Sequence, residues 1–238
     1  MKRIWFALLL LTFMLGCGPA MQPSPIPCME DPGKMEVKPE NVIAATTKAL
    51  VDAYVVGMDD DSLTSRDVVN ASFRMVRGLL LATGEYKRPA PGIACHMTWG
   101  TVNDRMWRRA DRLMAMLRLL DVQIWKPGTP KDIVIQTAVY AFSQGMSTAL
   151  GDGTVTIGEL VNIGFSATEA VLKLAGVWDQ VIDPANPNAT VAALVRIIHD
   201  STNDVLILFG LYDRPILVAD KGKIDVKGVV DATGLVPK

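Results

Sequence analysis

The stretch VAALVRIIHDSTNDVLILFGLY, residues 191–212, decides the fold class of this chain. Its apolar side chains recur at the i, i+3, i+4, i+7 spacing that gathers them on one face of an α-helix. The spacing predicts an amphipathic helix over 189–211, with its apolar face against a core. The positions in this row are Val191, Leu194, Val195, Ile198, Thr202, Val205, Phe209 and Tyr212.

The same spacing extends outward through the chain and predicts five more helices. They cover 40–57, 65–82, 101–121, 130–148 and 157–176. Gly84 follows the second range, and Pro130 opens the fourth, which are typical stop and start signals of helices. We therefore predict an all-α fold, a bundle of about six helices.

The C-terminal tail has a different pattern. Ile216-Leu217-Val218 and Lys223-Ile224-Asp225-Val226 are two short apolar runs on either side of Lys221-Gly222. Two such runs separated by a turn signal favour a small β-hairpin. We expect a short irregular or β-hairpin tail after the bundle.

The charge balance argues against one class of partner. The chain has 24 Lys and Arg against 25 Asp and Glu, a formal charge of −1. A nucleic-acid-binding domain typically has a clear basic excess, so no nucleic acid is expected as a partner. Residues 40–238, about 200 in number, suit one domain with a sizeable core.

The first seventeen residues have the order of a secretory leader. Lys2 and Arg3 precede the apolar run 4–15, and Gly16-Cys17 follow. A basic start, a short apolar region and a small residue at the cleavage point are typical of a signal peptide. The apolar run is shorter than the roughly 18–20 residues that cross a bilayer as a helix.

Met14-Leu15-Gly16-Cys17 resembles the lipobox of bacterial lipoproteins, although Met14 stands where such boxes usually have Leu. The resemblance implies cleavage after residue 16 and acyl chains, such as palmitate, on Cys17. It also implies a lipid-anchored protein in the bacterial cell envelope, and Gly18, which is not Asp, favours the outer membrane facing the periplasm. The proline-rich segment 17–39 would then be a semi-rigid tether. The alternative is an ordinary cleaved leader with Cys17 incidental.

Two more cysteines remain if Cys17 carries lipid. An even number of cysteines in an oxidising compartment is typical of disulfide pairing. A Cys28–Cys95 bridge would join the tether to the domain, and closing such a loop stabilises a fold by about 4 kcal/mol in the chain-entropy model. The alternative is two unpaired thiols.

Two segments share a rhythm that resembles the second half of an EF-hand calcium loop. In the segment 151–160, Asp152, Gly153 and Glu159 match the last three fixed places of the family pattern. Thr148 and Leu150 occupy its earlier acidic places, and the segment 60–69 repeats the rhythm. The resemblance implies a calcium-modulated module, with its ligands among Asp60, Asp61, Asp67, Asp152 and Glu159.

The same residues have a simpler interpretation. Thr64 with Asp67, and Thr156 with Glu159, have the spacing of helix N-terminal capping boxes. In this interpretation the acidic side chains serve exposed helix amides rather than an ion.

The calcium interpretation makes a structural prediction of its own. Paired EF-hand loops join through short strands, and a looser third copy of the rhythm begins at Gly222. We therefore expect a strand bridge between Val155 and either Leu63 or Ile224 if that interpretation holds.

The helix predicted over 101–121 has a basic stripe. At 100° per residue its arginines gather on one arc beside the apolar face. This stripe would suit anionic headgroups or an acidic partner. The alternative is an ordinary solvated face. The residues of the stripe are Arg105, Arg108, Arg109 and Arg112.

No recognisable catalytic motif is present. His96 and His199 are the two histidines, and neither lies in a zinc-binding spacing. The sequence contains no nucleophile elbow, HExxH motif or phosphate loop. We therefore expect no cofactor and a non-enzymatic envelope lipoprotein that binds another envelope protein or itself. The alternatives are the calcium-modulated module and an enzyme with an unrecognised site.

Overall fold

The computed structural model describes residues 38–60, 62–90, 97–116, 123, 130–183, 186–208, 210–220 and 223–236. The helices in this part of the chain are α2 (Pro39–Gly57), α3 (Ser65–Ala82), α4 (Trp99–Met116), α5 (Lys131–Ala149), α6 (Ile157–Leu174), α7 (Val191–Leu208) and α8 (Val226–Ala232). The strands are β1 (Thr154–Thr156), β2 (Val181–Asp183), β3 (Asn186–Thr190) and β4 (Pro215–Val218), with short 3-10 turns η1 (Glu85–Lys87) and η2 (Leu150–Asp152).

The fold is mainly helical, as the apolar spacing predicts. A helix occupies most of each of the six predicted ranges, and a further helix, α8, lies in the tail. Two small antiparallel sheets, β1 with β4 and β2 with β3, complete the described part of the chain. None of the helices in that part is long and apolar enough to cross a membrane.

The expected C-terminal hairpin is wrong. β4 pairs with β1 instead, with Val155 opposite Leu217. Ile216 and Leu217 are 8% and 3% exposed, so this pairing buries apolar side chains that a free hairpin would leave in water. Further along the tail, the Asp225 side chain accepts from the Gly228 amide and caps α8.

The same pairing contradicts the expected strand bridge between the loops. Val155 lies opposite Leu217, rather than opposite Leu63 or Ile224. The loop before α6 therefore pairs with the segment that follows α7, and not with the other loop.

The six long helices form two copies of one three-helix unit. α5, α6 and α7 each begin 92 residues after α2, α3 and α4 (131 − 39 = 92), and each has the same length as its counterpart. An isolated bridge of Thr64 with Gln123 recurs under this shift as the pair Thr156 with Pro215. The loop rhythm seen in the sequence is therefore one part of a repeat that spans both halves.

Local capping explains why the two copies begin their second helix alike. The Thr64 hydroxyl accepts from the Asp67 amide while the Asp67 carboxylate accepts from the Thr64 amide, and Thr156 and Glu159 repeat both bonds. Such reciprocal bonds satisfy amides that a helix start leaves without partners. The predicted capping boxes are confirmed.

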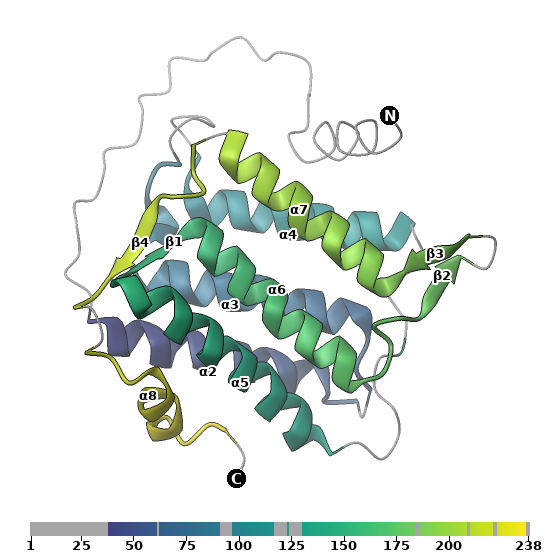
Figure 1. The fold of residues 1–238 in the computed structure, drawn as a ribbon, viewed down its shortest axis with the longest axis horizontal. Coiled ribbons are helices and arrows are strands. Elements are labelled where there is room, and N and C mark those ends of the chain that lie inside the picture. Colours follow the sequence, from purple (N-terminus) through teal and green to yellow (C-terminus); the bar gives the residue numbers. More distant parts are fainter. Residues whose placement is uncertain are drawn as a thin grey trace.

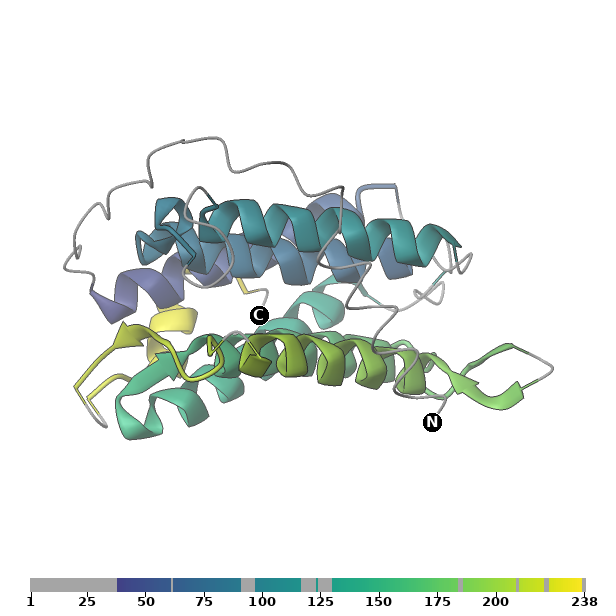
Figure 2. The same ribbon diagram turned by 90° about the horizontal axis from the view of Figure 1, so that it is seen from above.

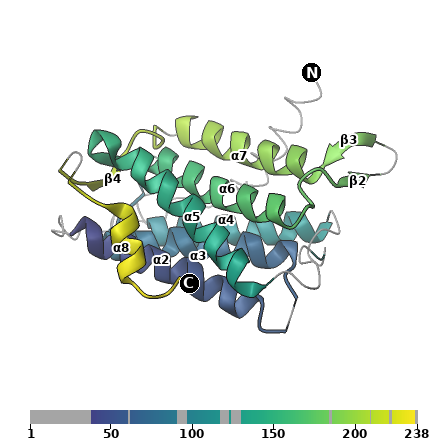
Figure 3. The same cartoon turned by 60° about the horizontal axis from the view of Figure 1, so that its bottom comes forward.

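The two copies stack as two layers (Figures 1 and 2). α2, α3 and α4 form one layer, and α5, α6 and α7 form the other. α3 contacts α6 at the centre, α2 contacts α5 along one side, and α8 packs against both α2 and α5 (Figure 3). α4 and α7 make at most sparse contact across the layers, so the two layers diverge on that side.

The core fills the side on which the layers meet. Tyr54 of α2 and Phe142 of α5 are almost completely buried. Burying side chains of this size stabilises a fold by about 1.5–3 kcal/mol each. Burial also raises the pKa of the Tyr54 hydroxyl. Gly78 allows α2 and α3 to pack closely, since a Cβ there would lie 2.6 Å from the Ala49 Cβ.

Candidate functional site

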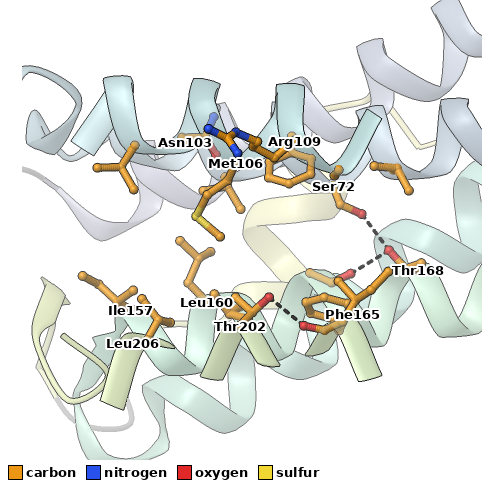
Figure 4. A pocket seen from close by; sticks show the side chains of 18 of the residues that line it. Ser72, Asn103, Met106, Arg109, Ile157, Leu160, Phe165, Thr168, Thr202 and Leu206 are labelled. Atoms are coloured by element: carbon orange, nitrogen blue, oxygen red, sulfur yellow. Dashed lines mark hydrogen bonds between the residues drawn. The ribbon is translucent and has the colours of Figure 1, made fainter. Parts of the chain in front are cut away.

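A partly open cavity of about 230 Å³ lies on the diverging side of the two layers. Its walls come from α3 and α4 of one layer and α6 and α7 of the other (Figure 4). The lining is predominantly aliphatic and aromatic. Cavities of this kind, apolar with a few polar groups and formed between helices, are the usual sites of small-molecule binding.

The repeat explains why the cavity lies here. Positions related by the 92-residue shift line its opposite walls, since each copy turns the same apolar face toward the other layer. Because α4 and α7 do not close on each other, these faces line a cavity and not a packed interface. The equivalent pairs include Val69 with Val161, Phe73 with Phe165, and Met106 with Ile198.

The three hydroxyls of the lining already have partners. The Ser72 and Thr168 hydroxyls lie 2.6 Å apart, and Thr168 also donates to the Gly164 carbonyl at 3.1 Å (Figure 4). Thr202 donates to the Ile198 carbonyl at 2.7 Å. These bonds satisfy the hydroxyls within their own helices or across α3 and α6.

Two buried donors of the lining are different. Trp99 and Asn103 lie one turn apart on α4, and each is 5% exposed. Within the described part of the chain, the Trp99 Nε1 and the Asn103 Nδ2 have no hydrogen-bond acceptor. A buried donor without an acceptor is rare because it loses its bonds to water, and it destabilises the fold by about 1–3 kcal/mol.

A cluster of charged side chains lies beside Trp99. Glu85 is 6% exposed and pairs with Arg88 within the first layer. Its other oxygen lies 3.8 Å from the Arg214 guanidinium, which also lies 5.4 Å above the Trp99 ring. Glu85 and Arg214 belong to different copies, so the cluster links the two halves electrostatically.

A second aromatic ring supports the Phe side chain of the first copy. Trp107 stacks on Phe73 with ring centroids 6.4 Å apart. Its indole nitrogen donates to the Asn70 Oδ1 at 2.7 Å, which holds the ring in place.

The second copy supports its own Phe side chain in an equivalent way. His199 packs on Phe165 with ring centroids 4.6 Å apart, and its Nε2 lies 2.7 Å from the Asn162 Oδ1. His199 and Asn162 stand 92 residues after the Trp and Asn of the first copy. His199 therefore helps to hold the Phe165 ring in place.

The carboxylates of the two loops serve their own turns. The Asp60 Oδ1 accepts from the Ser62 amide and hydroxyl, and the Asp152 Oδ1 accepts from Thr154 in the same way. The bonds from Ser62 lower the pKa of Asp60.

Asp67 and Glu159 are engaged in the capping boxes, and Asp61 lies outside the described residues. Among the described residues, no group of three or more His, Cys, Asp or Glu is arranged to hold a metal ion. The calcium sites stay a prediction, and any ion would compete with these hydrogen bonds.

The basic stripe lies on α4 and divides into two parts. Arg105, Arg108 and Arg112 are exposed, whereas Arg109 is half-buried and lines the cavity. Arg108 donates to the Asp104 carbonyl at 3.3 Å. The sequence indicated the arc of arginines, but nothing in it distinguished Arg109 from the others.

Several predicted site residues lie outside the described part of the chain. They are Cys17, Cys28 and Cys95, so the lipid anchor and the disulfide stay predictions.

Sequence reasoning missed the two unsatisfied donors of the cavity, Trp99 and Asn103. Their i, i+4 spacing beside the apolar face of a predicted helix was the signal that could have found them.

The comparisons with known proteins add no further assignment. No protein-family model, no curated protein and no solved structure matches this chain. The residues of the cavity and the leader are therefore the basis on which a function can be proposed.

Proposed function

We propose that this protein is a lipid-anchored lipoprotein of the bacterial envelope whose helical domain binds a small apolar molecule between its two layers. The leader and the Cys17 motif support the anchor. The cavity carries the binding proposal, because about 230 Å³ lined mainly by apolar side chains has room for a ligand somewhat larger than benzene. The role is binding and not catalysis.

The dimensions and position of the cavity support a role in binding rather than a packing defect. The cavity is bounded by four helices that are otherwise regular, and the same faces of two equivalent units form its walls. Cavities without a ligand destabilise a fold in proportion to their volume. A bound apolar molecule would offset that loss by restoring the missing contacts.

The anchor is tested by the intact mass and membrane partitioning of the protein made in a bacterial host. We expect wild type and Cys28→Ser to carry diacylglycerol and acyl mass and to sediment with membranes, and Cys17→Ser to carry neither. A wild-type protein that is soluble, with only its leader removed, would contradict the anchor.

An envelope protein partner or self-association, expected from the sequence, stays a proposal beside this one.

The cavity is tested by the thermal unfolding midpoint of the full protein in buffer saturated with n-octane. A ligand that binds only the native state raises this midpoint. We expect a rise in wild type and none in Ala110→Leu, since Ala110 lines the cavity and the longer side chain would fill it. Ala115→Leu on the exposed side of α4 is the matched control and should keep the rise. An unchanged wild-type midpoint would refute the binding proposal.

A further inference from the structure

Opposite charges occupy equivalent positions on the outer faces of α4 and α7. Arg108 and Arg112 of α4 stand 92 residues before two residues of α7 (200 − 108 = 92). These two residues are Asp200 and Asp204, and all four side chains are exposed. The two copies of the three-helix unit thus carry charges of opposite sign at the same two places.

The charges belong to a row of side chains along each helix. The row has the spacing i, i+3, i+7 and i+10, which keeps its members on one face, as the a and d positions of a coiled-coil helix are. The outer row of α4 consists of Arg105, Arg108, Arg112 and Ala115, and the outer row of α7 consists of Ile197, Asp200, Asp204 and Ile207.

The outer row of α7 exposes apolar side chains at both of its ends. Ile197 is 44% exposed and Ile207 is 61% exposed, and the neighbouring Leu208 is 65% exposed. An exposed apolar patch beside charged residues is typical of a surface that binds another protein. Removing these side chains from water would favour association.

The arginines of the outer row of α4 have no carboxylate partner in the described part of the chain. The Arg108 Nε donates to the Asp104 carbonyl at 3.3 Å, and an Arg105 nitrogen lies 3.5 Å from the Met97 sulfur. Neither contact neutralises a positive charge. These guanidinium groups therefore keep their charge for a partner outside the molecule.

The aspartates of the outer row of α7 are in the same situation. The Asp200 side chain is 78% exposed and lies 3.8 Å from the His199 Nδ1. No Lys or Arg among the described residues lies within ion-pair distance of Asp200 or Asp204. Arg196 borders the row, but its guanidinium lies 5.8 Å above the Trp178 ring.

One molecule cannot pair its own two rows. Met106 of α4 and Ile198 of α7 line the cavity between these helices. At 100° per residue, each outer row lies roughly 100–180° around its helix from the cavity-lining residue. The two rows therefore face away from the space between α4 and α7, which lie in different layers (Figure 2).

We propose that the outer row of α4 in one molecule binds the outer row of α7 in another molecule of this protein. Arg108 meets Asp200 in a parallel alignment of the two helices and Asp204 in an antiparallel one. Arg112 meets the other aspartate in each case. In both alignments the small Ala115 lies opposite an isoleucine of α7, which leaves room for that side chain.

The complementarity identifies the partner as this chain itself. An anionic membrane surface would match the arginines of α4, but it would leave the aspartates and isoleucines of α7 unexplained. Because the contact joins two different surfaces, it is heterologous and can repeat from one molecule to the next. The proposal goes beyond ligand binding and does not depend on the cavity.

Sedimentation velocity of the full protein in neutral detergent micelles tests the association. We expect wild type to associate increasingly as its concentration rises. Its dissociation constant should rise at least about tenfold between about 0.1 M and about 1 M salt, because the Debye length falls from roughly 10 Å to roughly 3 Å. A wild type that stays monomeric at low salt would overturn the proposal. Binding of that monomer to phosphatidylglycerol vesicles would assign the arginines to anionic headgroups instead.

Two charge-reversal variants locate the contact. One carries Arg108→Asp with Arg112→Asp, and the other carries Asp200→Arg with Asp204→Arg. In each variant the two outer rows have like charges, so its self-association should weaken at least about a hundredfold.

An equimolar mixture of the two variants gives the decisive result. Each outer row of one variant then meets an oppositely charged row on the other, so association should return. A variant that had merely lost its fold would not restore association in the mixture. Failure of the mixture to associate, or unchanged association of either variant alone, would overturn the proposal.

The matched control is Lys48→Glu with Lys227→Glu. It changes the net charge as much as the reversal of the two arginines, at side chains that are 61% and 74% exposed on α2 and α8. This control should associate as wild type does. An equal weakening in the control would attribute the effect to net charge and would overturn the assignment to α4 and α7.

Discussion

α4 and α7 hold equivalent places in the two copies, yet their surfaces differ. Both present apolar side chains to the cavity. On the outside, Arg105 of α4 corresponds to Ile197 of α7, which is 44% exposed. In the cavity, Asn103 corresponds to Val195. The copies therefore share the lengths and spacing of their helices and differ in the polarity of equivalent positions on α4 and α7.

The same contrast holds in the turn that follows the second helix of each copy. Gly84 and Gly176 are equivalent and both have positive φ, so the backbone turns alike. The next residue is the buried Glu85 in the first copy and the buried Val177 in the second. The first copy thus has an ionic cluster at a position where the second copy has an apolar side chain. Four measurements would break or sharpen this comparison.

The largest effect is expected from the equivalent core positions Leu50 and Phe142. They are 1% and 0% exposed, so truncation leaves a cavity in each case. Phe142→Ala should lower the free energy of unfolding by about 3–5 kcal/mol and Leu50→Ala by about 2–5 kcal/mol. Urea unfolding measures both, with Tyr140→Ala, 62% exposed, as the control. A loss below roughly 1 kcal/mol at either position, on the order of a surface change, would contradict the shared core.

Glu85→Val places in the first copy the residue that the second copy has. It removes the carboxylate that pairs with the Arg88 guanidinium, which is 12% exposed, and breaking a buried ion pair destabilises a fold by about 3 kcal/mol. Lys87→Val on the exposed part of η1 is the control. Urea titration measures the free energy of unfolding of wild type and of both variants. A gain in stability would mean that the cluster weakens the fold.

The two capping boxes should respond alike. Thr64→Ala and Thr156→Ala each remove a hydroxyl that accepts a helix amide, which stabilises by about 1 kcal/mol. Since the sites lie in separate loops, the double variant should show the sum of the two losses in urea unfolding. Thr148→Ala, at an exposed position of α5, is the control. Clearly unequal losses would show that the copies differ in stability at this point.

The smallest effect concerns Asp60. Its pKa is lowered from the usual 3.8 because the Ser62 hydroxyl and then the Ser62 amide bond to the carboxylate. A lowered native pKa contributes stability above the usual pKa, and this contribution is lost as the pH falls through the lowered value. Ser62→Ala should raise the pKa toward its usual value, as followed by NMR of the carboxyl carbon. An unchanged pKa would assign the shift to another cause.

Several elements could be predicted because their causes are local. The capping pairs at Thr64 and Thr156, the glycine after the second helix and the apolar periodicity all act within one or two turns.

The tail could not be predicted in this way. The sequence favoured pairing the segment 216–218 with the run that follows it, whereas its partner is β1. Thr154 lies opposite Val218, a separation of 64 residues (218 − 154 = 64), and no local pattern specifies a pairing over that distance. The pairing forms because it buries Ile216 and Leu217 against the core.

The candidate site was predictable only in pieces. The arc of arginines on α4 follows from helical periodicity, but the half-burial of Arg109 depends on the opposite layer. Asn103 is an ordinary polar residue in the sequence. It becomes a buried donor without an acceptor only where α4 faces the cavity.

By itself, the sequence determined the positions of the six long helices, the capping boxes and the near-neutral charge, since each depends on composition or on neighbours along the chain. Only the tertiary structure decided the rest: that the helices form two equivalent layers, that β4 pairs with β1, and that α4 and α7 stay apart. These features depend on contacts between residues far apart in the chain, and packing of side chains, rather than local propensity, selects among such contacts.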